Sequence, residues 1–213
     1  MKARRSVVAL LPVALLAAGC SSPNGVDPSS VPPQLPTTVE APSATHLETR
    51  AAPGALPASD RSFGVLAPAG WANDTTKHPT TVLYLRAPQP SANVYPCFSV
   101  VKSVLKDPPA LEELVNQGMI AQRQKGATVT KLADRTVGGA PASGYAISRV
   151  AQGYDVAQTQ YYILNGSQVV VTTMTSAAKD KATATSTQES ILTSWSWGTP
   201  SSAAPTPAPS TTP

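Results

Sequence analysis

Most of this chain has no excess of basic over acidic residues. The 213 residues include 16 basic and 12 acidic side chains, which gives a net charge of +4 and a pI of about 9.2. Three of the basic residues, Lys2, Arg4 and Arg5, belong to an N-terminal segment with the pattern of a signal peptide, and 13 remain without them. A near-neutral chain lacks the clustered Lys and Arg that bind phosphates, so we expect no nucleic-acid partner.

The groups that carry catalysis or bind metals are also few. His46 precedes the expected domain and His78 is the one histidine inside it, which indicates neither a two-His metal set nor a Ser-His-Asp arrangement. Glu112 and Glu113 are adjacent on an expected helix, where we interpret them as solvated. Paired carboxylates for glycoside hydrolysis meet only in space, so the sequence leaves that chemistry open. We expect no enzyme activity, no cofactor and no metal.

A long apolar run is absent as well. The longest, residues 7–18, is shorter than the roughly 20 residues of a transmembrane helix. It follows the basic start, and its end overlaps the motif Leu16-Ala17-Ala18-Gly19-Cys20. This pattern resembles the lipobox of a bacterial lipoprotein signal peptide. The resemblance implies cleavage between Gly19 and Cys20, a diacylglycerol on the Cys20 thiol and an acyl chain such as palmitate on the new amine.

Lipidation of Cys20 would determine where the protein works. Each buried methylene contributes about 0.8 kcal/mol to membrane binding, and two or more chains give a stable anchor. We therefore predict a lipid-anchored protein on the extracytoplasmic face of the cell membrane, in the cell envelope. A secreted protein with a chance cysteine at this position is the competing interpretation. With Cys20 lipidated, Cys97 has no intramolecular partner, and we interpret it as a small core residue of an apolar strand.

Composition divides the chain into four parts. Residues 1–19 form the signal peptide, and residues 20–59 hold the lipidated cysteine and a Pro/Ser/Thr-rich tether. Residues 60–198 form the domain and contain every aromatic residue, and residues 199–213 form a Pro/Thr-rich tail. The tether and the tail cannot bury enough apolar surface to fold, so we predict that both are extended and disordered. O-linked sugars on these two segments stay an open possibility.

The sequence of the domain predicts an α+β fold. A helix is expected to begin at Asp107-Pro108-Pro109, with Asp107 as its cap, and to end at Lys125-Gly126. A second helix is expected at residues 179–195, and Asn165-Gly166 predicts a tight hairpin. Alternating apolar residues predict strands at 63–68, 82–86, 98–104, 128–132, 142–150, 157–164 and 168–175. This order indicates an antiparallel sheet flanked by helices.

One motif carries a family resemblance. Phe63-x-Val65-x-x-Pro68-x-Gly70-Trp71 is similar to the opening hairpin of the Mog1/PsbP-like fold. Together with the lipobox, it makes the chain resemble the LpqN/LpqT-type lipoproteins of mycobacteria and other actinobacteria. The wider relatives of this family are mostly accessory proteins that bind a larger partner, and they share no catalytic motif. The resemblance therefore implies a non-catalytic, membrane-tethered module that binds an envelope protein.

Aromatic residues support an alternative function. Trp71 and the six tyrosines could line an apolar cleft, which would make the protein a carrier of an apolar small molecule or an envelope lipid. Side chains alternate across a strand, so Tyr161 and Tyr162 must face opposite sides. Ester hydrolysis is a third interpretation. The tyrosines concerned are Tyr84, Tyr95, Tyr145, Tyr154, Tyr161 and Tyr162.

Overall fold

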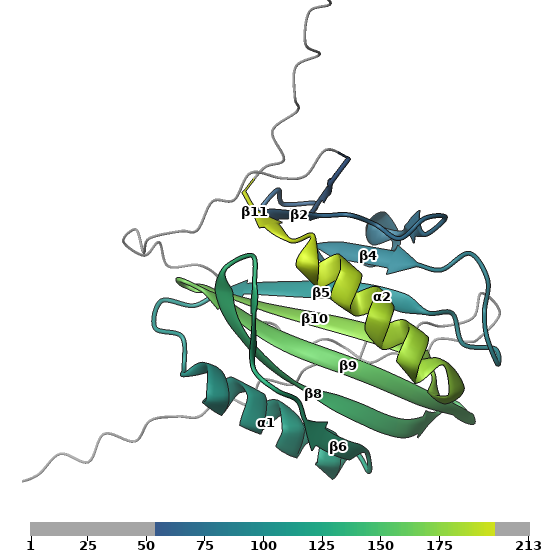
Figure 1. The fold of residues 1–213 in the computed structure, drawn as a ribbon. Helices are drawn as coiled ribbons and strands as arrows, with labels where there is room; N and C mark the ends of the chain where they lie inside the picture. The colour runs from purple at the N-terminus through teal and green to yellow at the C-terminus, as the bar shows by residue number, and fades with distance from the viewer. Residues whose placement is uncertain (1–53, 199–213) are drawn as a thin grey trace, which may run out of the picture.

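A computed structural model describes residues 54–198, which begin and end in a small antiparallel sheet. Its strands are β1 (Leu56–Pro57), β2 (Phe63–Val65) and β11 (Ser196–Trp197), in the order β1-β2-β11. The first and last strands of the described part therefore lie on either side of β2 (Figure 1). The predictions for the signal peptide, for Cys20 and for the tail fall outside the described residues.

The main sheet has eight strands, and every pairing in it is antiparallel. The order is β3-β4-β5-β10-β9-β8-β6, and β7 also pairs with β8. Successive hairpins join β8, β9 and β10, whereas β5 reaches β10 from far along the chain. The strands are β3 (Ala72–Asn73), β4 (Leu83–Arg86), β5 (Cys97–Val104), β6 (Thr128–Lys131), β7 (Arg135–Val137), β8 (Ala140–Ala151), β9 (Tyr154–Asn165) and β10 (Gln168–Ala177).

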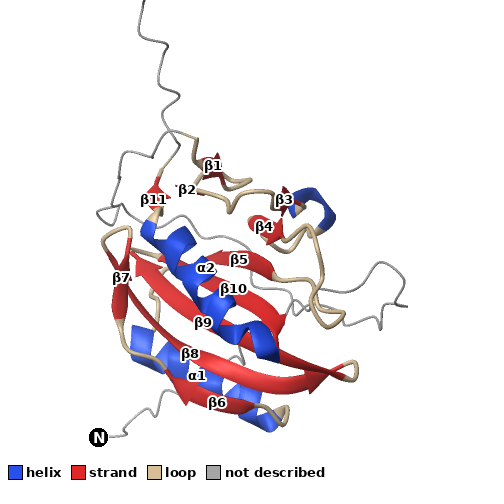
Figure 2. Cartoon of the chain, turned by 45° about the vertical axis from the view of Figure 1, so that its right-hand side comes forward, coloured by secondary structure: helices blue, strands red, loops and turns tan. Residues whose placement is uncertain are grey.

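Two helices cover opposite faces of this sheet. Helix α1 (Leu111–Gln124) packs against β6, β8 and β9, and α2 (Lys181–Thr193) packs against β9 and β10. Figure 2 shows α2 in front of the sheet and α1 behind it. Short 3-10 turns, η1 (Thr75–Lys77) and η2 (Ala178–Asp180), precede β4 and α2. The predicted α+β class, an antiparallel sheet flanked by helices, is confirmed.

Each face of the sheet has its own apolar core. The α2 face holds the larger one, which contains Phe63, Tyr161, Trp195 and Trp197. The α1 face holds a smaller one, in which Tyr162 and Tyr145 pack against residues of α1. Tyr161 and Tyr162 thus face opposite sides, as strand alternation predicts. The domain is stabilised mainly by burial of these two apolar layers.

Local details differ from the predictions at turns and helix starts. Helix α1 begins at Leu111 with Ala110 as its N-cap, so the prediction of Asp107 as the cap is wrong. Proline disfavours a helical conformation in the residue before it, which moves the start beyond Pro109. The predicted β9–β10 hairpin is present, but Gly166 with φ of 59° is the first of its two loop residues, and Asn165 is the last residue of β9. Only Gly166 needs the left-handed conformation.

Candidate functional site

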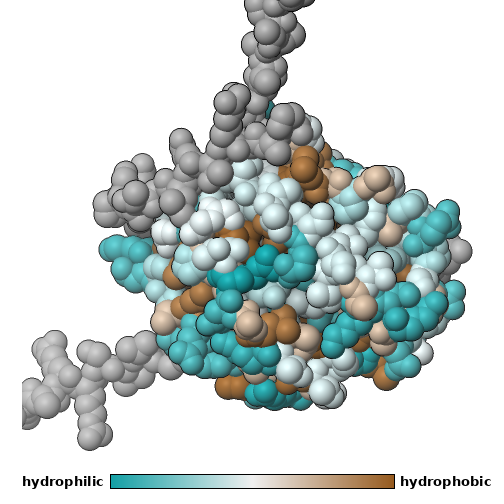
Figure 3. Space-filling view, in the orientation of Figure 1, coloured by the Kyte–Doolittle hydropathy of each residue, from teal (hydrophilic) through white to brown (hydrophobic). Residues whose placement is uncertain are grey.

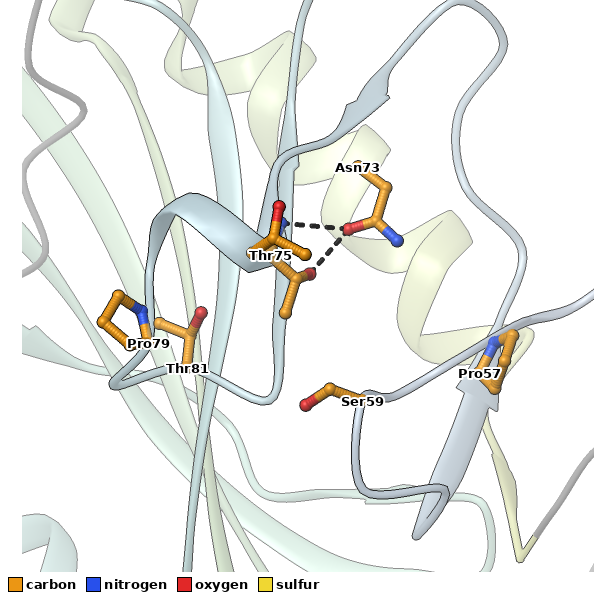
Figure 4. Close-up of a pocket in the computed structure, with 7 residues that line it drawn as sticks. Pro57, Ser59, Asn73, Thr75, Pro79 and Thr81 are labelled. Carbon is orange, nitrogen blue, oxygen red and sulfur yellow. Dashed lines mark hydrogen bonds between the residues drawn. The ribbon is translucent and has the colours of Figure 1, made fainter.

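A small pocket lies between the start of the described chain and the edge of the main sheet. It has a volume of about 310 Å³, near the lower end of the range for small-molecule sites. β1 and the loop after it form one wall, and the segment from β3 to β4 forms the other (Figure 4). Most of the lining residues are exposed, so the pocket opens to solvent. They are Pro57, Ser59, Asn73, Thr75, Thr76, Pro79 and Thr81.

Hydrogen bonds within the pocket hold one wall in place. Asn73 Oδ1 accepts from the backbone N–H of Thr75 at 3.1 Å and from Thr75 Oγ1 at 2.6 Å, which shapes the turn into η1 (Figure 4). Thr75 Oγ1 in turn accepts from the backbone N–H of Tyr84 at 2.8 Å, so η1 is tied to β4. Asn73 Nδ2, Ser59 Oγ and Thr76 Oγ1 donate to no other described residue. These three groups are free to bind a ligand.

An ionic cluster lies directly beside the pocket. Asp74 is buried, and its Oδ1 lies 2.7 Å from Lys77 Nζ while its Oδ2 lies 2.8 Å from Arg86 Nε. Hydrogen bonds from Lys77, and then from Arg86, hold the pKa of the Asp74 carboxyl below its usual value. Arg86 also places its guanidinium over the ring of Tyr95, 4.8 Å from the centroid. All three charges are therefore engaged with one another, and the pocket itself is lined by neutral groups.

His78 belongs to the same region but has a structural role. Its ring stacks on that of Tyr84, with centroids 3.6 Å apart and planes 18° apart. Burial lowers the pKa of His78, so its imidazole is neutral at neutral pH. Burial also raises the pKa of Tyr84 to about 12, so the phenol stays protonated. The pair forms a packed aromatic stack beside a neutral pocket.

Replacing Asp74 tests how strongly this cluster supports the pocket. We expect Asp74→Asn to lower the free energy of unfolding by about 1.5 kcal/mol at pH 7, since Lys77 and Arg86 lose charged hydrogen bonds. The lowered pKa means that the carboxylate stabilises the fold above its ordinary value of 3.8 and ceases to do so as pH falls through the folded-state value. Urea unfolding of both proteins should therefore show a gap at pH 7 that narrows below pH 3.8. An equal gap at all pH values would contradict the assignment.

The structure does not gather the residues that the sequence singled out. Glu112 and Glu113 are exposed in the first turn of α1, as expected for solvated side chains. His46 and Cys20 lie outside the described residues. Cys97 is buried, with 1% of its surface exposed, and it is disulfide-bonded. This burial in β5 agrees with the prediction that Cys97 is a small core residue of an apolar strand, whereas its expected lack of a disulfide partner was stated for a chain with lipid on Cys20.

The aromatic residues line no common cleft. Tyr145 and Tyr162 lie under α1, Tyr161 lies in the core under α2, and Tyr154 is exposed at the β8–β9 turn. Trp71 packs at the edge of the α2-face core, while Tyr84 and Tyr95 belong to the cluster beside the pocket. Their distribution over both faces of the sheet reflects alternation within strands rather than a shared site.

Sequence reasoning missed the pocket itself. Its most informative signal is Asn73 two residues before Thr75, a spacing that favours a turn closed by the asparagine side chain. That signal predicts a turn and says nothing about the second wall, which Pro57 and Ser59 bring from the start of the domain.

Two further properties bear on function. Within residues 54–198, no group of three or more His, Cys, Asp and Glu side chains could hold a metal ion. Among the helices in the same range, none is both long enough and apolar enough to cross a bilayer.

The architecture defines an α+β domain built on an antiparallel sheet, and solved structures of similar proteins are known. LpqN of Mycobacterium tuberculosis, a protein involved in cell envelope biogenesis, is 16% identical, with a TM-score of 0.49 over 73% of this chain and 92% of that one. The cyanobacterial PsbP protein CyanoP of Synechocystis sp. PCC 6803 is 12% identical, with a TM-score of 0.49 over 67% of this chain and 91% of that one. No family model and no curated protein matches the chain.

Proposed function

We propose that this chain is a lipoprotein anchored through Cys20 at the extracytoplasmic face of the cell membrane, and that its domain is a non-catalytic module that docks on another envelope protein. The observation that supports docking is the open pocket with three unengaged polar groups, Asn73 Nδ2, Ser59 Oγ and Thr76 Oγ1. Protein interfaces carry about one hydrogen bond per 100–200 Å² and include ordered water, so an exposed rim of neutral donors and acceptors suits a polypeptide partner.

The chemistry of the pocket favours binding over catalysis. A general base or an activated nucleophile needs a side chain that exchanges protons near neutral pH. The lining residues are hydroxyl, amide and proline side chains, which do not titrate in that range. The neighbouring Asp74 carboxylate is held by Lys77 and Arg86, and the imidazole of His78 is stacked on Tyr84. None of these groups is arranged to activate Ser59.

The same pocket does not favour the carrier of an apolar ligand. Such a carrier needs an apolar wall that buries most of its ligand. Here the large apolar side chains pack in the two cores of the main sheet, and the pocket is lined by small side chains, with proline and threonine as its apolar groups. On the face that carries α2, apolar residues are scattered in small areas (Figure 3). Lipid that co-purifies with the chain in stoichiometric amount would support the carrier instead.

A photoreactive side chain in place of Thr76 tests the docking proposal. The full precursor carries it in an actinobacterial host, and a matched chain carries it in place of Thr130, an exposed residue of β6 at the opposite edge of the main sheet. We expect a discrete protein adduct from position 76 and none from position 130. Adducts of equal intensity from both positions, or none from either, would contradict docking at the pocket.

The second arm of the test concerns the anchor. We expect the Cys20→Ala chain to leave the membrane fraction and the Cys97→Ala chain to remain in it. Mass spectrometry of the N-terminal peptide should detect a diacylglycerol on Cys20. A mature chain without lipid on Cys20 would contradict the proposed lipid anchor. The crosslinking result would remain a separate test of docking at the pocket.

A further inference from the structure

One end of the domain gathers basic side chains around the tip of the β8–β9 hairpin. Arg149 lies in β8 close to that tip. Helix α1 ends beside it, because Thr128, at the start of β6 shortly after the helix, lies opposite Ser148 of β8. The start of α2 also lies beside the hairpin, where η2 contacts β9 (Figure 1). We name this region the basic end, and its basic residues are Arg123, Lys125, Arg149, Lys179 and Lys181.

The charges of the described domain are distributed unevenly. Residues 54–198 contain 12 basic and 9 acidic side chains, of which five basic and only two acidic ones, Asp155 and Asp180, lie at the basic end. The rest of the domain therefore has equal numbers of each sign. The excess of positive charge in the domain is confined to one end, where it can attract an anionic surface.

The cations of the basic end take no part in ion pairs. None of the five forms an ion pair with a carboxylate of the described residues, and all except Arg149 are exposed. The first turn of α2 holds no acidic residue, and Lys181 lies where the positive end of the helix dipole disfavours a cation. These charges therefore add little to the stability of the fold. Ion pairs elsewhere in the domain use Lys77, Arg86, Lys102, Lys131 and Arg135.

Arg149 is the most informative of the five cations. Its side chain is half-buried, and its Nε is buried with no hydrogen-bond partner among the described residues. Burial lowers the pKa of the guanidinium, and the residue directly opposite Arg149 is the apolar Val156. A buried polar atom almost always has a partner, because its desolvation is otherwise uncompensated. An anionic oxygen from outside the domain would supply a strong one.

Two large apolar side chains project from the same hairpin. Val150 is 68% exposed and Tyr154 is 41% exposed. They flank a turn in which Gln152 and Gly153 have φ of 52° and 82°, the conformation of a tight two-residue hairpin loop. Because Ala151 lies opposite Tyr154, strand alternation places Val150 and Tyr154 on opposite faces of the hairpin. The tip thus presents an apolar group on each face, and a tyrosine is well suited to a membrane–water interface.

We propose that the basic end of the domain binds the membrane surface directly, with its cations on anionic phospholipid headgroups and with Val150 and Tyr154 in the interface. Clustered cations are attracted to anionic lipid, and exposed apolar side chains add affinity by entering the boundary with the acyl chains. This surface is separate from the pocket, because β3 and β8 lie near opposite edges of the main sheet. The presence of a membrane beside the domain rests on the proposed anchor, whereas the affinity of the basic end for lipid does not.

Sedimentation with vesicles tests this binding without the anchor. The chain from Cys20 to Pro213, made without its signal peptide, carries no lipid of its own. We expect it to bind vesicles of phosphatidylglycerol and phosphatidylcholine in equal parts about tenfold more tightly than vesicles of phosphatidylcholine alone. Added salt should release it, so a salt wash of cell membranes keeps this contact distinct from a lipid on Cys20. Failure to bind the phosphatidylglycerol vesicles would overturn the proposal.

A matched pair of charge variants locates the contact. Lys179→Gln/Lys181→Gln should weaken binding to the phosphatidylglycerol vesicles about tenfold. Arg61→Gln/Lys106→Gln removes two exposed cations away from the basic end and should change binding little. Equal losses in the two double variants would overturn the assignment to this end, because they would show a response to net charge alone.

A second matched pair distinguishes a membrane from a soluble polyanion. Val150→Gln/Tyr154→Gln leaves the charge unchanged and should weaken vesicle binding about tenfold, with circular dichroism as the check on folding. Val104→Gln changes a residue that is 60% exposed at the end of β5 and should have little effect. Full binding by Val150→Gln/Tyr154→Gln would overturn membrane contact in favour of a general polyanion site. None of these results alters the crosslinking expected at position 76.

Discussion

Gly118→Ala will destabilise the domain by about 3 kcal/mol, although replacing glycine by alanine inside a helix ordinarily stabilises it by about 1 kcal/mol. Gly118 lies on the buried face of α1, against the sheet. A Cβ at this position would lie 2.3 Å from Tyr162 Oη and 2.5 Å from Tyr145 Oη. The missing side chain is thus what lets the helix approach two phenol groups.

The two tyrosines cannot easily move away from such a methyl group. Both are buried, and their hydroxyl groups lie 3.2 Å apart. Tyr145 Oη also donates to Gln160 Oε1 at 2.6 Å. Displacing either ring breaks a buried hydrogen bond in addition to disturbing the packing, and both effects lower the free energy of unfolding.

Urea unfolding with a double-mutant cycle measures the effect. Tyr162→Phe removes the nearest oxygen, so the Gly118→Ala/Tyr162→Phe chain should regain part of the lost stability. Asn116→Ala, an exposed change in the same helix, is the control and should be neutral or slightly stabilising. A Gly118→Ala chain as stable as the wild type would show that α1 does not pack this closely on the sheet.

The second large effect is expected at Phe63. Phe63→Ala should lower the free energy of unfolding by about 4 kcal/mol, within the range for a buried phenylalanine. The ring is fully buried and stacks on Trp195 with centroids 4.0 Å apart, and it meets Trp197 edge-on at 6.4 Å. It joins the small sheet to the core of the main sheet, so its loss opens a cavity at that junction.

Thermal and urea unfolding of three chains tests this prediction. Phe63→Leu keeps most of the volume and should lose less than about half as much as Phe63→Ala. Leu66→Ala, a change at an exposed apolar residue shortly after β2, should have a small effect. Near-wild-type stability of Phe63→Ala would contradict the junction described here. The change in tryptophan fluorescence on unfolding should be smaller for Phe63→Ala than for the wild type, because the surroundings of Trp195 and Trp197 are altered in the folded variant.

Sequence patterns predicted the fold where local signals and burial agree. Two-residue alternation in β8, β9 and β10 determines which side chains meet each core, so opposite placement of Tyr161 and Tyr162 follows from the chain alone. The helical spacing of Leu114, Val115 and Met119 likewise predicts the buried side of α1. The α+β class follows from the order of these elements.

The pocket could not be predicted in the same way. Its walls are strands of two residues, β1 and β3, and the 3-10 turn η1, all too short to have a periodic pattern. Ser59 reaches the other wall through its backbone N–H, which donates to Val82 O at 2.8 Å. Such a contact depends on tertiary packing. The disulfide of Cys97 was not predicted either, because the sequence pattern assigned the thiol of Cys20 to lipid.

The position of β2 between β1 and β11 has a mechanical consequence. Pairing of Phe63 with Trp197 brings the entry and exit of the domain to neighbouring strands, and Gly198 N–H adds a bond of 2.9 Å to Ser62 O. A force that pulls the two ends of the domain apart therefore acts first on the few hydrogen bonds of the small sheet, which break one after another. The long strands of the main sheet would bear that force only after the strands of the small sheet had separated.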